Sequence, residues 1–158
     1  MLGDLMNSYE DDLMQFFAND IAAGNIVVLP DSTEYFMKLA AKFPFQGSKI
    51  DWEALPGSIE QMERRPRFQM EAFVHFFCNI TTDCNLEGDI VYMGDSVTDF
   101  ALKSRKEIFE NFLRKIFEVP QHHYFVAVDF SWCMVFTFEG DMSFSRAPSN
   151  NKGQTTND

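Results

Sequence analysis

The 158-residue sequence predicts a single α+β domain with a mainly antiparallel sheet and helices packed on one face of it. A chain of this length forms one hydrophobic core rather than two. Its 46% hydrophobic and 15% aromatic content is too high for a disordered chain. Strand patterns gather in the last third of the sequence, and this clustering favours an antiparallel sheet over alternating βαβ units.

The first predicted elements are a helix and a short strand. Apolar residues recur at helical spacing over residues 8–23, between a capping residue, Ser8, and a glycine stop at Gly24. Residues 26–29 form an apolar, mostly β-branched run closed by Pro30, a pattern typical of a buried strand.

A second helix is predicted before a long irregular segment. Asp31 and Glu34 form a capping signal, one apolar face follows, and Pro44 ends the pattern. Residues 46–66 show no clear period, so we expect irregular structure there, with a short helix from Ser58 as an alternative.

The middle of the chain is harder to interpret, because residues 67–80 carry two conflicting periods. The alternating pattern is longer than the helical one, and we therefore predict a strand. A second strand is predicted over residues 89–93, and Ser96 opens a helical turn. A capping box at Ser104 begins an amphipathic helix that ends at Val119.

The remaining sequence predicts sheet followed by a tail. Its three strands are predicted over residues 123–130, 132–138 and 142–145. Residues 139–141, Glu-Gly-Asp, form the hairpin turn between the last two. Residues 147–158 lack any large apolar side chain and are predicted to be a disordered tail, which leaves residues 1–146 as the domain.

The charge balance is strongly acidic, with 13 Lys and Arg against 24 Asp and Glu and a net charge of −11. Proteins that bind nucleic acid or anionic membranes use clustered basic residues, so we expect neither kind of partner. An acidic protein instead attracts basic partners. Residues 1–63 hold eleven acids against three lysines, and most of the excess therefore lies there.

Two interpretations of these acids stay open. They form a solvated surface that keeps the chain soluble, or a docking surface for a basic protein. Trp52 is the best anchor for such a surface, because a loop tryptophan flanked by acids fits an interface hot spot; a folded-back core contact is the alternative. The candidate partner-binding residues are Glu10, Asp11, Asp12, Asp20, Asp51, Trp52, Glu53, Glu60 and Glu63.

The cysteine count and the N-terminus bear on localisation. Cys78, Cys84 and Cys133 cannot all pair with one another, which favours a reducing compartment. The N-terminus has no basic segment before an apolar run, and no stretch approaches about 18 consecutive apolar residues. We therefore expect a cytoplasmic protein without a signal peptide or a membrane span.

Residues 94–96, Gly-Asp-Ser, follow a predicted strand and resemble the serine block of the GDSL/SGNH hydrolases. The resemblance implies Ser96 as a nucleophile, with its base supplied by a C-terminal Asp-x-x-His. That second motif does not occur in the chain, and helix capping by Asp95 or Ser96 explains the same residues. No glycine-rich phosphate loop occurs either, so we predict that the protein is not an enzyme.

A metal site is the other chemistry to consider. His75, Cys78 and Cys84 are residue types that bind zinc, but on a strand His75 and Cys78 would point to opposite faces. The adjacent His122 and His123 diverge in the same way. We therefore predict buried structural thiols, no metal and no cofactor.

Residues 123–145 resemble the end of small bacterial immunity proteins, including those of contact-dependent growth inhibition. In several such families a hairpin carries a tryptophan, a β-branched run and a terminal Glu-Gly turn. The residues that carry this pattern here are Trp132, Val135, Thr137, Glu139 and Gly140. Many of these families have a histidine before the glutamate, where this chain has Phe138.

The resemblance implies a cytoplasmic protein that binds and neutralises a cognate toxin, often a basic nuclease, without catalysis of its own. The acidic charge and the lack of catalytic motifs agree with this hypothesis. The alternative is an acidic DNA mimic that inhibits a nucleic-acid enzyme, which requires carboxylates spaced like phosphates over one large face.

Overall fold

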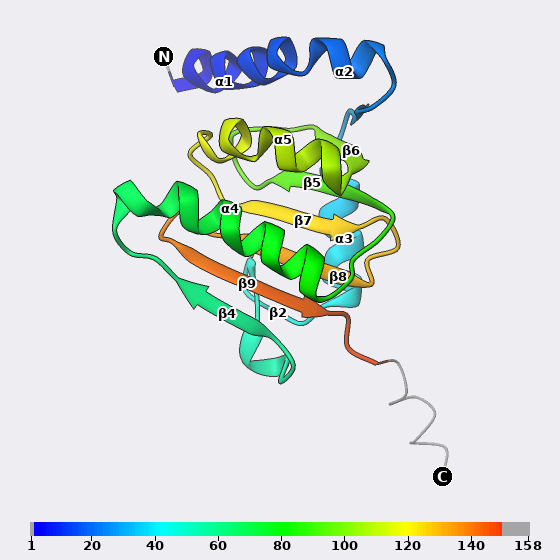
Figure 1. Ribbon diagram of the computed structural model, residues 1–158, viewed down its shortest axis with the longest axis vertical. Helices are drawn as coiled ribbons and strands as arrows, with labels where there is room; N and C mark the ends of the chain where they lie inside the picture. The colour runs from blue at the N-terminus through cyan, green and yellow to red at the C-terminus, as the bar shows by residue number, and fades with distance from the viewer. Residues whose placement is uncertain (1, 150–158) are drawn as a thin grey trace.

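A seven-stranded antiparallel sheet with the strand order β1-β6-β5-β7-β8-β9-β4 lies at the centre of the protein (Figure 1). The computed structural model describes residues 2–149, with side chains described from Ser8 onward. A separate two-stranded sheet pairs β2 with β3. The strands are β1 (Val27–Leu29), β2 (Phe45–Gln46), β3 (Lys49–Ile50), β4 (Ile59–Met62), β5 (Asp89–Gly94), β6 (Ala101–Arg105), β7 (His123–Ala127), β8 (Trp132–Phe136) and β9 (Asp141–Arg146).

Helices lie on both faces of the large sheet. In Figure 1, α4 and α5 lie in front of the sheet, α3 lies behind it, and α1 and α2 lie at the end opposite β4. The helices are α1 (Leu2–Phe16), α2 (Ala18–Ala22), α3 (Thr33–Lys42), α4 (Pro66–Asp83) and α5 (Lys106–Phe117), with a 3-10 turn η1 (Trp52–Ala54). The α+β class and the antiparallel sheet predicted from the sequence are confirmed.

The larger core fills the face covered by α1, α4 and α5. Helix α5 contributes the predicted apolar stripe, with Phe109, Leu113 and Ile116 buried. These side chains pack with alternate residues of the strands, among them Phe125 of β7 and Phe136 of β8. Burial of this apolar surface supplies most of the favourable free energy of the fold.

A second core lies on the other face, beneath α3, where no helix was expected. Leu39 and Phe43 of this region pack with the remaining strand residues, such as Val91 and Val126. The expectation that helices cover only one face is therefore corrected. The physical reason is that β7 and β8 are buried along their whole length, and strands that are apolar on both sides need cover on both sides.

The strand predicted over residues 67–80 is wrong, because this segment lies within helix α4. Its alternating apolar residues are not all buried: Phe68 is exposed, whereas Phe73, Phe77 and Ile80 form the buried face at helical spacing. Pro66 occupies the first turn of the helix, where its missing N–H is tolerated. The burial of one face, not the longer alternation, identifies the element.

Three further local predictions also fail. The segment after Ser58 is strand β4 rather than a short helix, because it pairs with β9. The segment from Ser96 forms bends rather than a helical turn. Ser104 belongs to strand β6, which the sequence did not predict, and its hydroxyl donates to the carbonyl of Asn25 at 2.6 Å instead of capping α5.

The chain end and the cysteines complete the description. Residues 147–149 have no regular structure, and residues 150–158 of the predicted tail lie outside the described residues. The thiols of Cys78, Cys84 and Cys133 are free. Within residues 2–149, no helix combines the length and the apolar character needed to cross a membrane.

Candidate functional site

A cavity of about 450 Å³ lies on the α3 side of the sheet, next to strand β4. A neighbouring cavity of about 410 Å³ shares Lys49, His122 and Tyr124 with it and reaches Phe36 and Asp95. We call the two together the α3-side groove. The first cavity is lined by Lys49, Ile50, Trp52, Glu60, Gln61, Met62, His122, Tyr124, Val135, Thr137, Asp141 and Ser143.

The register of the sheet determines the floor of the groove. Glu60 of β4 lies opposite Ser143 of β9, which lies opposite Val135 of β8, and Val135 lies opposite Tyr124 of β7. Residues directly opposite each other in antiparallel strands place their side chains on the same face. One row therefore crosses four strands and presents a carboxylate, a hydroxyl, an apolar side chain and a phenol to the groove.

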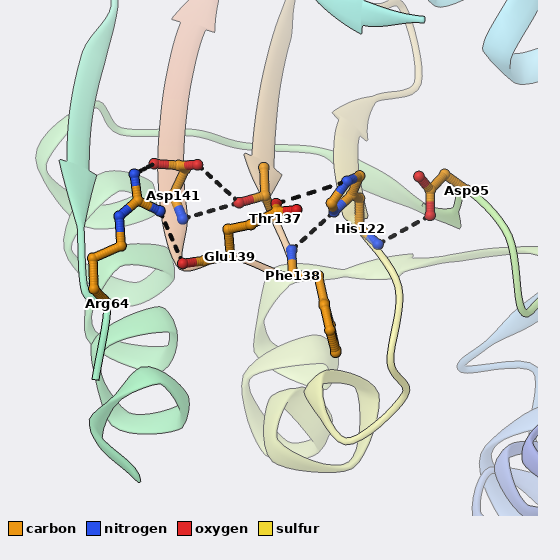
Figure 2. A network of polar contacts seen from close by, with 7 residues as sticks. All are labelled: Arg64, Asp95, His122, Thr137, Phe138, Glu139 and Asp141. Atoms are coloured by element: carbon orange, nitrogen blue, oxygen red, sulfur yellow. Dashed lines mark hydrogen bonds and ion pairs between the residues drawn. The ribbon is translucent and has the colours of Figure 1, made fainter. Parts of the chain in front are cut away.

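The rim beside β4 is held by a polar network around the β8–β9 hairpin (Figure 2). The guanidinium of Arg64 lies 2.8 Å from Asp141 and donates to the Glu139 carbonyl at 2.9 Å. The Thr137 hydroxyl donates to the Asp141 carboxylate at 3.1 Å and accepts the Asp141 backbone N–H at 3.0 Å. These contacts link the residues after β4 to the turn between β8 and β9, and they fix the position of this turn at the rim of the groove.

His122 lies between the two cavities and connects the hairpin to the end of β5 (Figure 2). Its Nδ1 accepts the backbone N–H of Phe138 at 2.8 Å, so the neutral ring carries its proton on Nε2. That nitrogen lies 4.0 Å from the carboxylate of Glu139, and the His122 backbone N–H donates to Asp95 at 3.0 Å. The His122 side chain therefore lines both cavities, with its Nε2 near the Glu139 carboxylate.

A buried network supports the loop at the end of β5. The side-chain oxygen of Gln121 accepts the backbone N–H groups of Ser96, Val97 and Thr98 at 3.3, 2.8 and 3.2 Å. Its side-chain nitrogen donates to the hydroxyl of Tyr92 at 3.0 Å. One buried amide thus fixes the whole loop, which explains why Gln121 is buried despite its polarity.

The same network holds a neutral histidine. The Tyr92 hydroxyl accepts the Gln121 side-chain N–H and lies 2.7 Å from His123 Nδ1, to which it donates its proton when the neutral ring is protonated on Nε2. Burial lowers the pKa of His123 to about 3, and the neighbouring His122 acts in the same direction. Burial also raises the pKa of Tyr92 far above its ordinary value. Both side chains are therefore neutral at physiological pH.

Gly94 is expected to be intolerant of alanine because of this network. A Cβ at Gly94 would overlap the side-chain amide of Gln121 and displace it from the loop N–H groups. We expect Gly94→Ala to lower the free energy of unfolding by about 2 kcal/mol or more, since buried N–H groups lose their acceptor. In a Gln121→Ala background the same change should cost less than about 0.5 kcal/mol. Urea unfolding of the wild type, the two single variants and the double variant measures this coupling. If the two single losses of stability simply add in the double variant, the explanation is wrong.

The predicted partner-binding residues do not form one surface. Glu10, Asp11, Asp12 and Asp20 lie on α1 and α2, at the end of the long axis opposite β4 (Figure 1). Asp12 pairs with Lys115, and Glu10 accepts the backbone N–H of Asp99. Asp20 accepts the side-chain amide of Asn25. Asp11 is exposed.

The other predicted residues lie at the β4 end. Trp52 and Glu60 line the same cavity, and Asp51 and Glu53 flank Trp52 in the chain. Glu63 directly follows β4, and its carboxylate accepts hydrogen bonds from Nε and Nη2 of Arg65 at 2.8 and 2.9 Å. The structure therefore brings Trp52 together with Glu60 and separates them from the acids of α1. A DNA mimic needs one continuous acidic face, and this division gives it no support.

The geometry supports neither a serine hydrolase site at Ser96 nor a metal site. The backbone N–H groups that would form an oxyanion hole next to Ser96 are bound to Gln121. Among the described residues, the Ser96 hydroxyl has no hydrogen bond with a histidine. Residues 8–149 contain no group of three or more His, Cys, Asp or Glu side chains placed to hold a metal.

Several groove residues have no signal in the sequence. Lys49 and Tyr124 line both cavities, and Ser143 lies at the centre of the floor, yet none belongs to a motif. Tyr124 and Ser143 share a face through the pairing of β7 with β8 and of β8 with β9, and Lys49 of β3 lines the same cavity. The sequence did point to Trp52 and Glu60 through the acidic charge, and to Val135 and Thr137 through the resemblance of the C-terminal hairpin.

Comparison of the chain with protein-family models, with curated proteins and with solved structures found no match. Conclusions about function therefore depend on the geometry and the charge of the α3-side groove.

Proposed function

We propose that the protein is an immunity protein that binds and neutralises a cognate, basic, nuclease-type bacterial toxin, and that it docks through the β4 end of the α3-side groove. The observation that carries the proposal is the set of acids around Trp52. Asp51, Glu53 and Glu60 form no ion pair with a basic side chain of the described residues, whereas Asp12 and Glu63 do. Their charge is therefore available to a partner.

The geometry beside these acids fits a protein partner. Trp52 is partly buried against the second core and lines the cavity, so part of the indole is fixed while another part remains accessible. Binding energy at interfaces concentrates in such aromatic anchors, surrounded by a polar rim. The unpaired acids supply electrostatic complementarity to a basic surface, which increases the association rate and disfavours acidic partners.

Co-expression with the product of the adjacent upstream reading frame tests the proposal directly, because toxin and immunity genes are commonly neighbours in such systems. We expect the upstream product to inhibit growth alone, and this protein to restore growth and to co-purify with it. If the upstream product inhibits growth but is neither bound nor neutralised, the proposal is wrong.

Substitutions at the two acidic ends locate the docking surface. Trp52→Ala should raise the Kd for the toxin at least about thirtyfold, as expected for an interface hot spot. Asp11→Lys provides the matched control, because Asp11 is an exposed acid at the far end of the molecule. It should change the Kd less than about threefold, since a distant surface charge is screened by salt. Isothermal titration calorimetry measures both, and the reverse order of effects would place the docking surface on α1.

A further inference from the structure

The outer edge of strand β4 is an open sheet edge. β4 is the last strand in the order of the sheet, and within residues 2–149 it pairs only with β9. All four of its residues, Ile59 to Met62, are exposed. A terminal strand carries a row of backbone N–H and C=O groups that can pair with another strand.

The ladder shows which backbone groups point outward. The Glu63 N–H donates to the Gly140 carbonyl at 2.9 Å, so this pair is hydrogen-bonded across the two strands. In an antiparallel ladder, hydrogen-bonded and non-bonded positions alternate. Ile59 and Gln61 therefore direct their N–H and C=O groups toward β9, and Glu60 and Met62 direct theirs away from it.

The two outward positions are also the two that face the groove. Glu60 and Met62 lie opposite Ser143 and Asp141, and all four residues line the cavity. A strand added to β4 would place the residue opposite Glu60 on the same face, because paired residues share a face. Every second side chain of that strand would then lie over the α3-side groove.

β4 lacks several of the features that protect an edge. Its four residues contain no lysine and no proline, its pairing with β9 has no bulge, and Glu60 is its one charged residue. Met62 is 64% exposed and Ile59 is 38% exposed, so both faces of the edge offer apolar contact. The opposite edge differs, because β1 has three residues and is followed directly by Pro30.

We propose that the outer edge of β4 binds an extended strand of a partner protein, and that a basic side chain of this strand lies opposite Glu60 over the α3-side groove. The charges favour a basic partner strand. Glu60 has no ion pair with a basic side chain of the described residues, although Lys49 lines the same cavity. Asp51 and Glu53 add negative charge beside Trp52, which also lines this cavity. A second copy of the chain would bring a net charge of −11 and is disfavoured by repulsion.

This inference rests on the proposed function for the identity of the partner, but its test does not need the toxin. The probe is a synthetic β-hairpin peptide with an Asn-Gly turn, whose free-edge strand alternates arginine with valine. The hairpin is preorganised, which lowers the entropic cost of binding. A matched peptide with glutamate in place of arginine is the control.

Amide hydrogen exchange of the full chain, measured by NMR with and without the peptide, reports on the edge directly. We expect the peptide to slow exchange at the amides of Glu60 and Met62 by at least about tenfold. The amide of Gln61 should change little, because it is already bonded to β9. The glutamate peptide should give no protection at any of the three.

Two variants sharpen the test. Glu60→Lys should abolish protection by the arginine peptide and create protection by the glutamate peptide. Met62→Pro removes an outward N–H and keeps the ladder with β9, as proline does at exposed edges, so the protein should fold and lose peptide binding. If this variant does not fold, the amide pattern of Glu60→Lys still decides the question.

The proposal is overturned if the arginine peptide does not protect Glu60 and Met62, or if it protects residues elsewhere. Protection of these amides that appears without peptide and rises with protein concentration would assign the edge to a second copy and would also overturn it. Edge binding by the peptide with no toxin complex would contradict the proposed function alone. A toxin complex that Glu60→Lys and Met62→Pro leave intact would contradict the edge proposal alone.

Discussion

Phe136→Ala is expected to lower the free energy of unfolding by about 3–5 kcal/mol, as large-to-small changes of buried aromatic residues do. Phe136 lies in β8 and is fully buried. Its ring lies 5.0 Å from that of Phe73 and 4.9 Å from that of Phe117, measured between centroids. It also contacts the rings of Phe76 and Phe125, both at 5.8 Å.

The substitution therefore removes contacts with α4, α5 and β7 at once and leaves a cavity that these rigid elements cannot fill. Phe138→Ala is the matched control, because Phe138 lies two residues further along and is 62% exposed. It should change stability by less than about 0.5 kcal/mol. Urea unfolding followed by far-UV circular dichroism measures both variants, and equal effects would contradict the assignment of Phe136 to the centre of the core.

The second large effect is a loss of stability in mild acid that originates at His123. In the unfolded chain this histidine binds a proton near its ordinary pKa of 6.5, whereas burial lowers its pKa in the folded protein to about 3. Between these values the unfolded state binds more protons. The contribution of His123 is therefore complete above pH 6.5 and decreases as the pH falls, by up to about 1.4 kcal/mol per unit.

The pH dependence caused by His123 can be separated from that caused by the carboxylates. Hydrogen bonds lower the pKa of four carboxyl groups from their ordinary values, which are 3.8 for Asp31 and Asp129 and 4.5 for Glu63 and Glu71. The stability that these groups contribute is therefore lost only at lower pH. From pH 6.5 to pH 5, His123 alone should remove about 1.6 kcal/mol.

Single substitutions of the histidines show which of them causes the loss of stability between pH 6.5 and pH 5. His123→Gln should flatten the dependence of the unfolding free energy on pH between 6.5 and 5, whatever its effect on stability at pH 7. His75→Gln is the control, because His75 is exposed on α4 and its replacement leaves the buried His123 in place. An unchanged slope in His123→Gln would show that this histidine is not buried in its neutral form.

The elements that the sequence predicted correctly are those with local signals. Helix α5 carries an apolar stripe of regular period, and the C-terminal strands are separated by a short turn at Gly140. Strand β4 could not be predicted this way, because all its residues are exposed and its existence depends on β9, far away in the chain. Helix α4 failed because its alternating apolar residues match both periods, and only packing against the sheet decides between them.

The candidate site was predictable in the same limited sense. Acidic composition drew attention to the segment around Trp52 and to Glu60, and both line the groove. The same reasoning selected the acids of α1, because sequence position says nothing about which end of a sheet an element reaches. Lys49 and Tyr124 line the groove because segments far apart in the chain lie side by side, which no local pattern predicts.

The pairing of β4 with β9 also has a consequence for the order in which the protein is made. β4 leaves the ribosome roughly 80 residues before β9, its one sheet partner among the described residues, since Ile59 pairs with Phe144. Closing such a long loop is entropically unfavourable and slow compared with forming a hairpin. The groove floor and the open edge thus form only when the last strand has been synthesised, and a chain shortened before β9 would lack both.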